Sequence, residues 1–161
     1  MRAARKMVAK GFTLVEILIV VVILGILAAI VIPQFTNASE AAKYSNMVSQ
    51  LQTVRSQIAL YQNQHNDAFP DLSTNWDQLT DETELDGTAP EAGDITYGPY
   101  LQKVPTNPFT DSSAVAGTPT TDGTASASVG WVWDGGVLKA SMEAAKATEL
   151  GADTTNDVVT Y

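Results

Sequence analysis

The hydrophobic residues are distributed so unevenly that the chain divides into two parts with different surroundings. Residues 17–32 are sixteen consecutive apolar positions, and together with the five residues before them they predict a helix over 12–32. At ~1.5 Å per residue this helix is about 32 Å long, enough to cross a hydrocarbon core of ~30 Å. The first part of the chain is therefore predicted to span a membrane.

After Pro33 the apolar positions take a helical spacing. They recur every three or four residues in a single stripe, namely Tyr44, Met47, Leu51, Val54, Ile58 and Tyr61. This spacing predicts an amphipathic helix that buries one face, with polar faces suited to neighbouring helices. Because Pro70 disfavours helical geometry at Phe69, we expect the helix to end near Asn66 and Asp67.

The segment after this helix contains signals for a short helix followed by coil. Residues 73–85 predict the helix, capped by Ser73 or Thr74 and with three side chains turned inward, namely Trp76, Leu79 and Leu85. Residues 97–109 contain three prolines, which exclude a helix or a central strand. We expect this coil to pack its aromatic side chains on the helix stripe, and residues 86–99 and 110–130 to be exposed loops.

Alternating and β-branched residues near the C-terminus predict strands. Residues 129–133 and 137–140 are joined through Asp-Gly-Gly at 134–136, which predicts a hairpin. Residues 141–150 favour a helix, and residues 156–161 are predicted to close the sheet as a last strand. The fold class is therefore α+β, with one long N-terminal helix packed on a small antiparallel sheet.

Charge and composition exclude several classes of function. The 161 residues carry a net charge of −9, and the part after Ile32 has five basic against seventeen acidic residues. This excludes sequence-independent nucleic-acid binding, which needs clustered Lys and Arg. The absence of cysteine excludes disulfides, Cys-ligated zinc and thiol chemistry. P-loop, dinucleotide, HExxH and GxSxG motifs are absent too, so we expect no enzyme.

The basic head, residues 1–10, and Glu16 indicate the orientation of the apolar segment and whether it is a signal peptide or a permanent membrane helix. Four of the nine basic residues lie in the first ten positions, which favours a cytoplasmic N-terminus with the acidic remainder across the membrane. A secretory signal peptide is the simpler interpretation, but the apolar run exceeds the usual ~7–15 residues. A carboxylate within such a segment costs up to roughly 3 kcal/mol in lipid. Glu16 is therefore either a membrane-edge residue that reaches the headgroups or the partner of a cation.

The string from Lys10 through Gly11, Phe12 and Glu16 to the apolar run before Pro33 resembles the type IV pilin superfamily, with its class III leader. The resemblance implies a pilin-like fold, cleavage between Gly11 and Phe12 by a prepilin peptidase, and N-methylation of Phe12. It divides the chain into a leader (1–11), a transmembrane and assembly helix (12–33) and an exported domain (34–161). Assembly would use Phe12, Glu16 and Pro33.

Cleavage would create a positive amino group at Phe12, one helical turn before Glu16. In a staggered bundle the carboxylate of one subunit meets the ammonium of its neighbour, which relieves two charges buried in lipid. Pro33 leaves the carbonyl of Ala29 without its helical donor, which favours a kink near the outer membrane surface. The resemblance adds that in related filaments the stretch ahead of this proline can lose helicity on assembly.

The proline-rich segment at 97–109 and Phe69-Pro70 resemble the G-type major pseudopilins of type II secretion. That resemblance implies a helical homopolymer with minor pseudopilins, held in the inner membrane by an assembly platform with a cytoplasmic ATPase. Members of that group bind calcium in an acidic loop near the C-terminus, for which Asp153 and Asp157 are the candidates here; the alternative is that both are solvated surface acids and that the chain has no cofactor. The alternatives are a type IV pilin for adhesion, twitching or DNA uptake, and a monomeric binding module on a signal anchor.

Overall fold

The computed structural model describes residues 11–73, 75–117, 123–134 and 136–161. The chain forms two compact units, Met1–Ser39 and Glu40–Tyr161. The long helix α1 (Leu14–Gln64) contributes its first part to one unit and its second part to the other. The basic head at residues 1–10 lies outside the described residues.

The second part of α1 provides one wall of the core. Five stripe residues are buried, namely Met47, Leu51, Val54, Ile58 and Tyr61, and Tyr44 packs against them. The predicted stripe is therefore confirmed. The helix ends at Gln64, because Asn66 and Asp67 adopt left-handed backbone angles, with φ of 53° and 63°.

A four-stranded sheet forms the opposite wall, in the order β1 (Val115–Ala116), β2 (Trp131–Asp134), β3 (Val137–Met142) and β4 (Val158–Thr160). The hairpin strands β2 and β3 pair antiparallel, as predicted. However, β1 pairs parallel with β2, and β4 pairs parallel with β3. The sheet is mixed and not antiparallel, because each outer strand joins the sheet after a connection long enough to reverse the chain.

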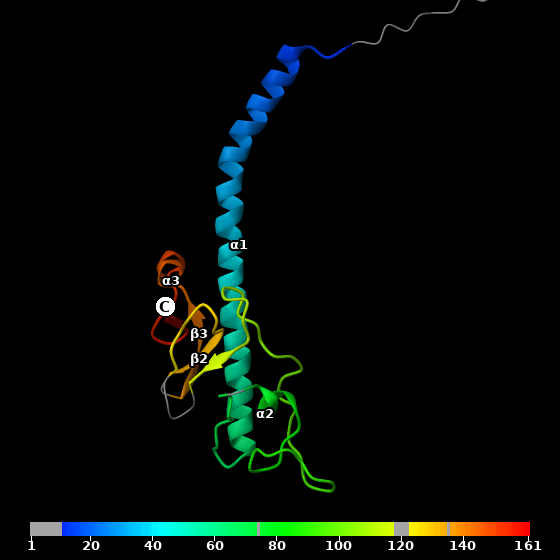
Figure 1. Ribbon diagram of the computed structural model, residues 1–161, viewed down its shortest axis with the longest axis vertical. Coiled ribbons are helices and arrows are strands. Elements are labelled where there is room, and N and C mark those ends of the chain that lie inside the picture. Colours follow the sequence, from blue (N-terminus) through cyan, green and yellow to red (C-terminus); the bar gives the residue numbers. More distant parts are fainter. Residues whose placement is uncertain (1–10, 74, 118–122, 135) are drawn as a thin grey trace, which may run out of the picture. The chain divides into compact units, whose positions relative to one another are not determined.

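The predicted hairpin contains Gly135, which lies outside the described residues, but the two strands on either side are in place. Figure 1 shows β2 and β3 beside the second part of α1. Trp131 and Trp133 are fully buried in the shared core. Trp131 also meets Trp76 edge-on, with ring centroids 6.4 Å apart. The α+β fold class is thus confirmed.

The predicted helix over 73–85 is much shorter than expected. Only α2 (Asp77–Thr80) is helical, and Trp76 precedes it without a side-chain cap. Ser73 instead bonds the Asp71 carboxylate, and Thr74 lies outside the described residues. Trp76 and Leu79 are buried as predicted, whereas Leu85 is exposed, because the chain becomes extended at Asp81 and pairs through Thr83 with Tyr97 before a second helical turn can form.

The proline-rich segment packs on α1 as predicted. Tyr100 meets Tyr61 edge-on, with centroids 5.4 Å apart, and its hydroxyl donates to Gln64. Leu101 joins the core. Asn107, which is fully buried, donates to the carbonyls of Gly130 and Ser141 and so joins the segment to the sheet.

The remaining predictions are partly confirmed. The predicted helix over 141–150 is present as α3 (Ala144–Leu150), which ends at Gly151 in a left-handed conformation. Its first residues belong to β3 instead. The expected loop over 110–130 contains β1, and residues 118–122 lie outside the described residues. Together these elements close the domain around one core.

Candidate functional site

The residues at the predicted cleavage site lie ahead of α1 and are exposed. Gly11, Phe12 and Thr13 have no regular structure. The Phe12 side chain is 80% exposed, and, its chain neighbours apart, no heavy atom of the described residues lies within 4 Å of a side-chain position at Gly11. An uncovered backbone without regular structure is what a peptidase needs at the bond it cuts.

Thr13 and Glu16 form a capping box at the start of α1. The Glu16 amide donates to the Thr13 hydroxyl at 3.2 Å, and the Thr13 amide and hydroxyl both point back to Glu16 Oε2 at 3.5 Å. These bonds satisfy backbone donors that the first turn leaves free. The Thr-x-x-Glu spacing indicates such a cap, so Glu16 has a local role besides the two that we expected from the sequence.

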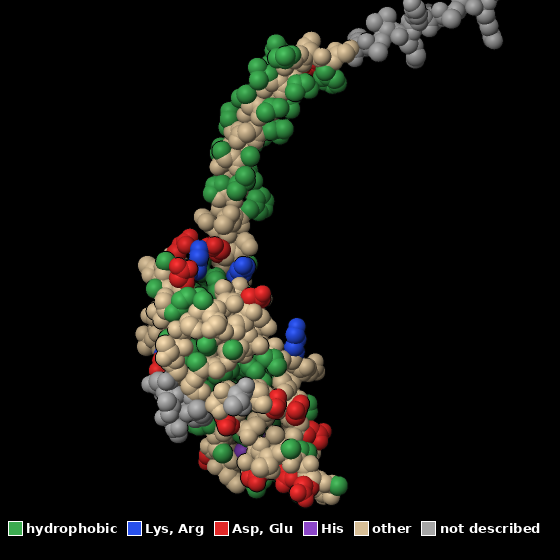
Figure 2. Space-filling view, viewed as in Figure 1, with side chains coloured by type: hydrophobic (Ala, Val, Ile, Leu, Met, Phe, Trp, Pro, Cys, Tyr) green, Lys and Arg blue, Asp and Glu red, His purple; other side chains and the backbone are tan. Residues whose placement is uncertain are grey.

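The first part of α1 exposes an apolar surface on the side of the molecule that Figure 2 presents. Its large hydrophobic side chains, from Leu14 to Ile32, are 41% to 81% exposed. By length and composition α1 is long and apolar enough to cross a membrane, and a signal sequence has the same two properties. Lipid or other helices are the two environments that suit this surface.

Pro33 lies inside α1, and the helix continues through it. The proline has no N–H to give to the preceding turn. One turn later, the Thr36 hydroxyl donates to the carbonyl of Ile32 at 3.1 Å. Bonding of a Thr hydroxyl to the carbonyl four residues earlier often accompanies bending of a helix.

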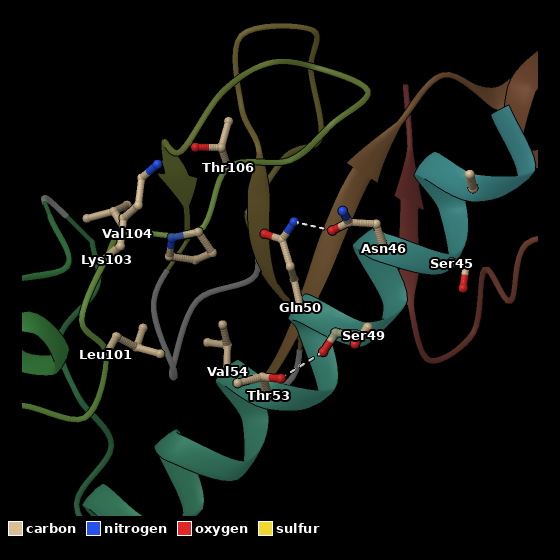
Figure 3. A pocket seen from close by; sticks show the side chains of 12 residues that line it. Ser45, Asn46, Ser49, Gln50, Thr53, Val54, Leu101, Lys103, Val104 and Thr106 are labelled. Carbon is tan, nitrogen blue, oxygen red and sulfur yellow. Dashed lines mark hydrogen bonds between the residues drawn. The ribbon is translucent and has the colours of Figure 1, made fainter. Parts of the chain in front are cut away.

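A groove of about 840 Å³ follows the polar face of α1 in the exported domain. One wall carries Asn46 and Gln50, whose side chains bond each other at 2.6 Å. The other wall is the segment from Leu101 to Thr106, with Lys103 at its lip (Figure 3). The polar face is thus partly uncovered along several turns, as a helix that contacts other helices requires.

The two calcium candidates lie in the loop before β4, and both carboxylates are engaged. Asp153 accepts hydrogen bonds from the side chain of Asn156 and from the amides of Asn156 and Thr155, and these bonds lower the pKa of its carboxyl. Asp157 pairs with the Arg55 guanidinium at 2.9 Å. Among the described residues no group of three or more His, Asp or Glu is arranged for a metal. These side chains therefore do not fit a calcium ion.

The comparisons with known proteins agree with the geometry at the start of α1. Residues 6–32 match the prokaryotic N-terminal methylation motif. Type II secretion system core protein G of Aeromonas hydrophila is 31% identical over 100 residues, which cover 62% of this chain and 67% of that protein. The same-named protein of Escherichia coli is 30% identical over 111 residues, covering 68% and 71%. The chain belongs to the type II secretion system core protein G family.

Another relative matches about a third of the chain. The type IV narrow pilus major component of Thermus thermophilus is 46% identical over 52 residues, which cover 32% of this chain and 45% of that pilin. No solved structure matches this chain with significance. The core protein G relatives thus match about twice as much of this chain as the pilin does.

Proposed function

We propose that the chain is the major pseudopilin of a type II secretion system and acts by polymerising into a membrane-anchored helical pseudopilus. The observation that carries this proposal is the apolar surface over residues 14–32, which the described residues leave uncovered and which has Glu16 near its start. A helix of this kind exchanges lipid for neighbouring helices at little hydrophobic cost. The role is structural and not catalytic.

Maturation comes first in the proposed mechanism. A prepilin peptidase cuts the exposed bond between Gly11 and Phe12 and methylates the new amino terminus at Phe12. The motif match over residues 6–32 and the uncovered backbone there support this step. Cleavage converts a neutral amide into an ammonium group at the very start of the helix.

Assembly then depends on the pairing of Glu16 with the Phe12 ammonium of a neighbouring subunit. Within one chain the carboxylate contacts Thr13 only at 3.5 Å, the weak end of hydrogen-bond distances. A charged donor at shorter range is a stronger partner in lipid. Adding a subunit therefore neutralises a carboxylate that a lone protomer leaves poorly paired.

Pro33 has its proposed role where the membrane segment meets the exported domain. The missing hydrogen bond there makes the helix easier to bend or unwind as the subunit leaves the bilayer. The groove beside Asn46 and Gln50 offers a polar surface to adjacent helices in the fibre. Both features lie on the helix that would form the centre of the filament.

The proposed location is the inner membrane, with one span, a cytoplasmic N-terminus before cleavage and a periplasmic domain. The partners are further copies of the chain, minor pseudopilins, the peptidase, and an assembly platform with a cytoplasmic ATPase that supplies the work. Nucleic acid is not a proposed partner, because binding to phosphates needs clustered basic side chains. Three of the basic side chains of the exported domain are instead held in ion pairs with its own carboxylates, namely Arg55, Lys139 and Lys146.

Deletion of the chain in its native host distinguishes this function from that of a surface pilin or a monomeric tether. We expect exported proteins to accumulate in the periplasm, and wild-type but not Glu16→Ala protein to restore their secretion. Loss of long surface fibres in electron micrographs, with secretion intact, would favour the pilin. Full rescue by Glu16→Ala would favour the tether.

A further inference from the structure

The loop before β4 is closed by a cation that belongs to the chain itself. The Arg55 side chain leaves α1 and reaches two segments that are far away in sequence. Its Nε and Nη2 donate to the carbonyl of Leu138 at 2.9 and 2.7 Å. Nη1 donates to Asp157 at 2.9 Å, and Nη2 also donates to the carbonyl of Asn156. One guanidinium therefore joins the helix, β3 and the loop.

The other carboxylate of this loop is saturated from within. Asp153 Oδ1 accepts the amides of Thr155 and Asn156 at 2.9 and 3.0 Å, and Oδ2 accepts the Asn156 side chain at 2.9 Å. The Asp153 carbonyl accepts the amides of Asp157 and Val158. Asp153 is thus paired within the loop, whereas Asp157 is paired with Arg55 of α1.

Calcium requires six to eight oxygen ligands. Here the Leu138 and Asn156 carbonyls and the Asp157 carboxylate all accept hydrogen bonds from the Arg55 guanidinium instead. A divalent ion at the same place would meet a fixed positive charge, because arginine stays protonated at any physiological pH. These acceptors can therefore hold the Arg55 guanidinium or a calcium ion, and not both.

We propose that Arg55 is the resident cation of the C-terminal loop and that the exported domain folds without calcium. The guanidinium does what a bound ion would do, because it neutralises Asp157 and holds two carbonyls in place. The loop is then closed as soon as α1 and the sheet pack, whatever the calcium concentration outside the cell. The inference concerns the fold of one chain and does not depend on polymerisation.

Thermal unfolding of the full chain in detergent tests the proposal directly, with tryptophan fluorescence as the signal. Calcium at a hundredfold excess over its dissociation constant would raise the melting temperature of a calcium-binding domain by roughly 10 °C. We expect the wild-type melting temperature to be the same in excess Ca²⁺ and in EGTA. A reversible rise in Ca²⁺ would overturn the proposal.

A matched pair of variants separates this role from that of an ordinary surface ion pair. Arg55→Met leaves Asp157 and two carbonyls without their donor, whereas Lys146→Met breaks the pairs with Glu40 and Glu149. The two basic side chains are almost equally exposed, at 27% and 26%. We expect Arg55→Met to lower the melting temperature several-fold more than Lys146→Met, and an equal or smaller loss would contradict the assignment.

Discussion

The imidazole ring of His65 stacks on the phenol ring of Tyr61, with centroids 3.8 Å apart and planes inclined by 2°. Its Nδ1 lies 2.9 Å from the Tyr61 carbonyl and its Nε2 lies 3.0 Å from the Thr83 hydroxyl. His65 and Thr83 are both buried. The only histidine of the chain therefore joins the end of α1 to the segment after α2.

Substitution His65→Ala is expected to destabilise the exported domain by about 2–4 kcal/mol. It removes the stacked ring and leaves the buried Thr83 hydroxyl without its partner. Urea unfolding of the full chain in detergent measures the loss. The control is Asn63→Ala, an exposed position on the same helical turn, where a change within about 0.5 kcal/mol is expected. Equal stability of the two variants would mean that His65 has no structural role.

The loop before β4 should weaken in acid. Hydrogen bonds from Asn156 and Thr155 lower the pKa of the Asp153 carboxyl, whereas an unfolded aspartate titrates at about 3.9. A lowered folded pKa gives stability that is complete above the unfolded value and is lost as the pH falls through the folded value. Asp153→Asn should therefore melt below wild type at neutral pH.

Melting curves from neutral pH down to about pH 2 check this prediction, because the protonated wild-type carboxyl then resembles the amide of the variant. The gap between the two melting temperatures should close in that range. A gap that stays constant with pH would show that the charge on Asp153 contributes nothing to the loop.

Processing is expected to depend on Gly11 and not on glycine in general. Mass spectrometry of the mature wild-type chain should show loss of residues 1–11 and addition of one methyl group at Phe12. Gly11→Val should remain at full length. Gly25→Ala, in the apolar run, meets no atom within 4 Å and should be processed normally. A mature terminus elsewhere, for example near Pro33, would contradict the leader assignment.

Local patterns predicted the parts of the fold that local physics decides. The stripe from Met47 to Tyr61 was readable because helical periodicity marks a buried face. The hairpin was readable from its turn residues. The direction of β1 and β4 was not, because it depends on how distant segments meet and not on their own composition.

The side-chain contacts that hold the domain together could not be predicted from the sequence either. Arg55 and Asp157 are 102 residues apart in sequence, and no spacing rule links them. Asn107 looked like one more polar residue among prolines, yet it bonds two carbonyls in the core. The acids before β4 suggested an ion because the sequence does not show that a basic side chain from α1 already occupies that position.

The Glu16 carboxylate has two roles that substitutions can separate. Glu16→Gln keeps a hydrogen-bonding partner for Thr13, since glutamine also completes a capping box, but it removes the charge. Thr13→Val removes the hydroxyl of the cap and keeps the charge. If pairing with the Phe12 ammonium drives assembly, only the first change should prevent it.

Chemical cross-linking of subunits in native membranes, with the peptidase and the assembly machinery present, compares these variants most directly. We expect a ladder of multimers for wild type and for Thr13→Val, and at least a tenfold loss of multimers for Glu16→Gln, which corresponds to about 1.4 kcal/mol or more of lost pairing free energy. A full ladder from Glu16→Gln would contradict the proposed pairing of Glu16 with the neighbouring amino terminus.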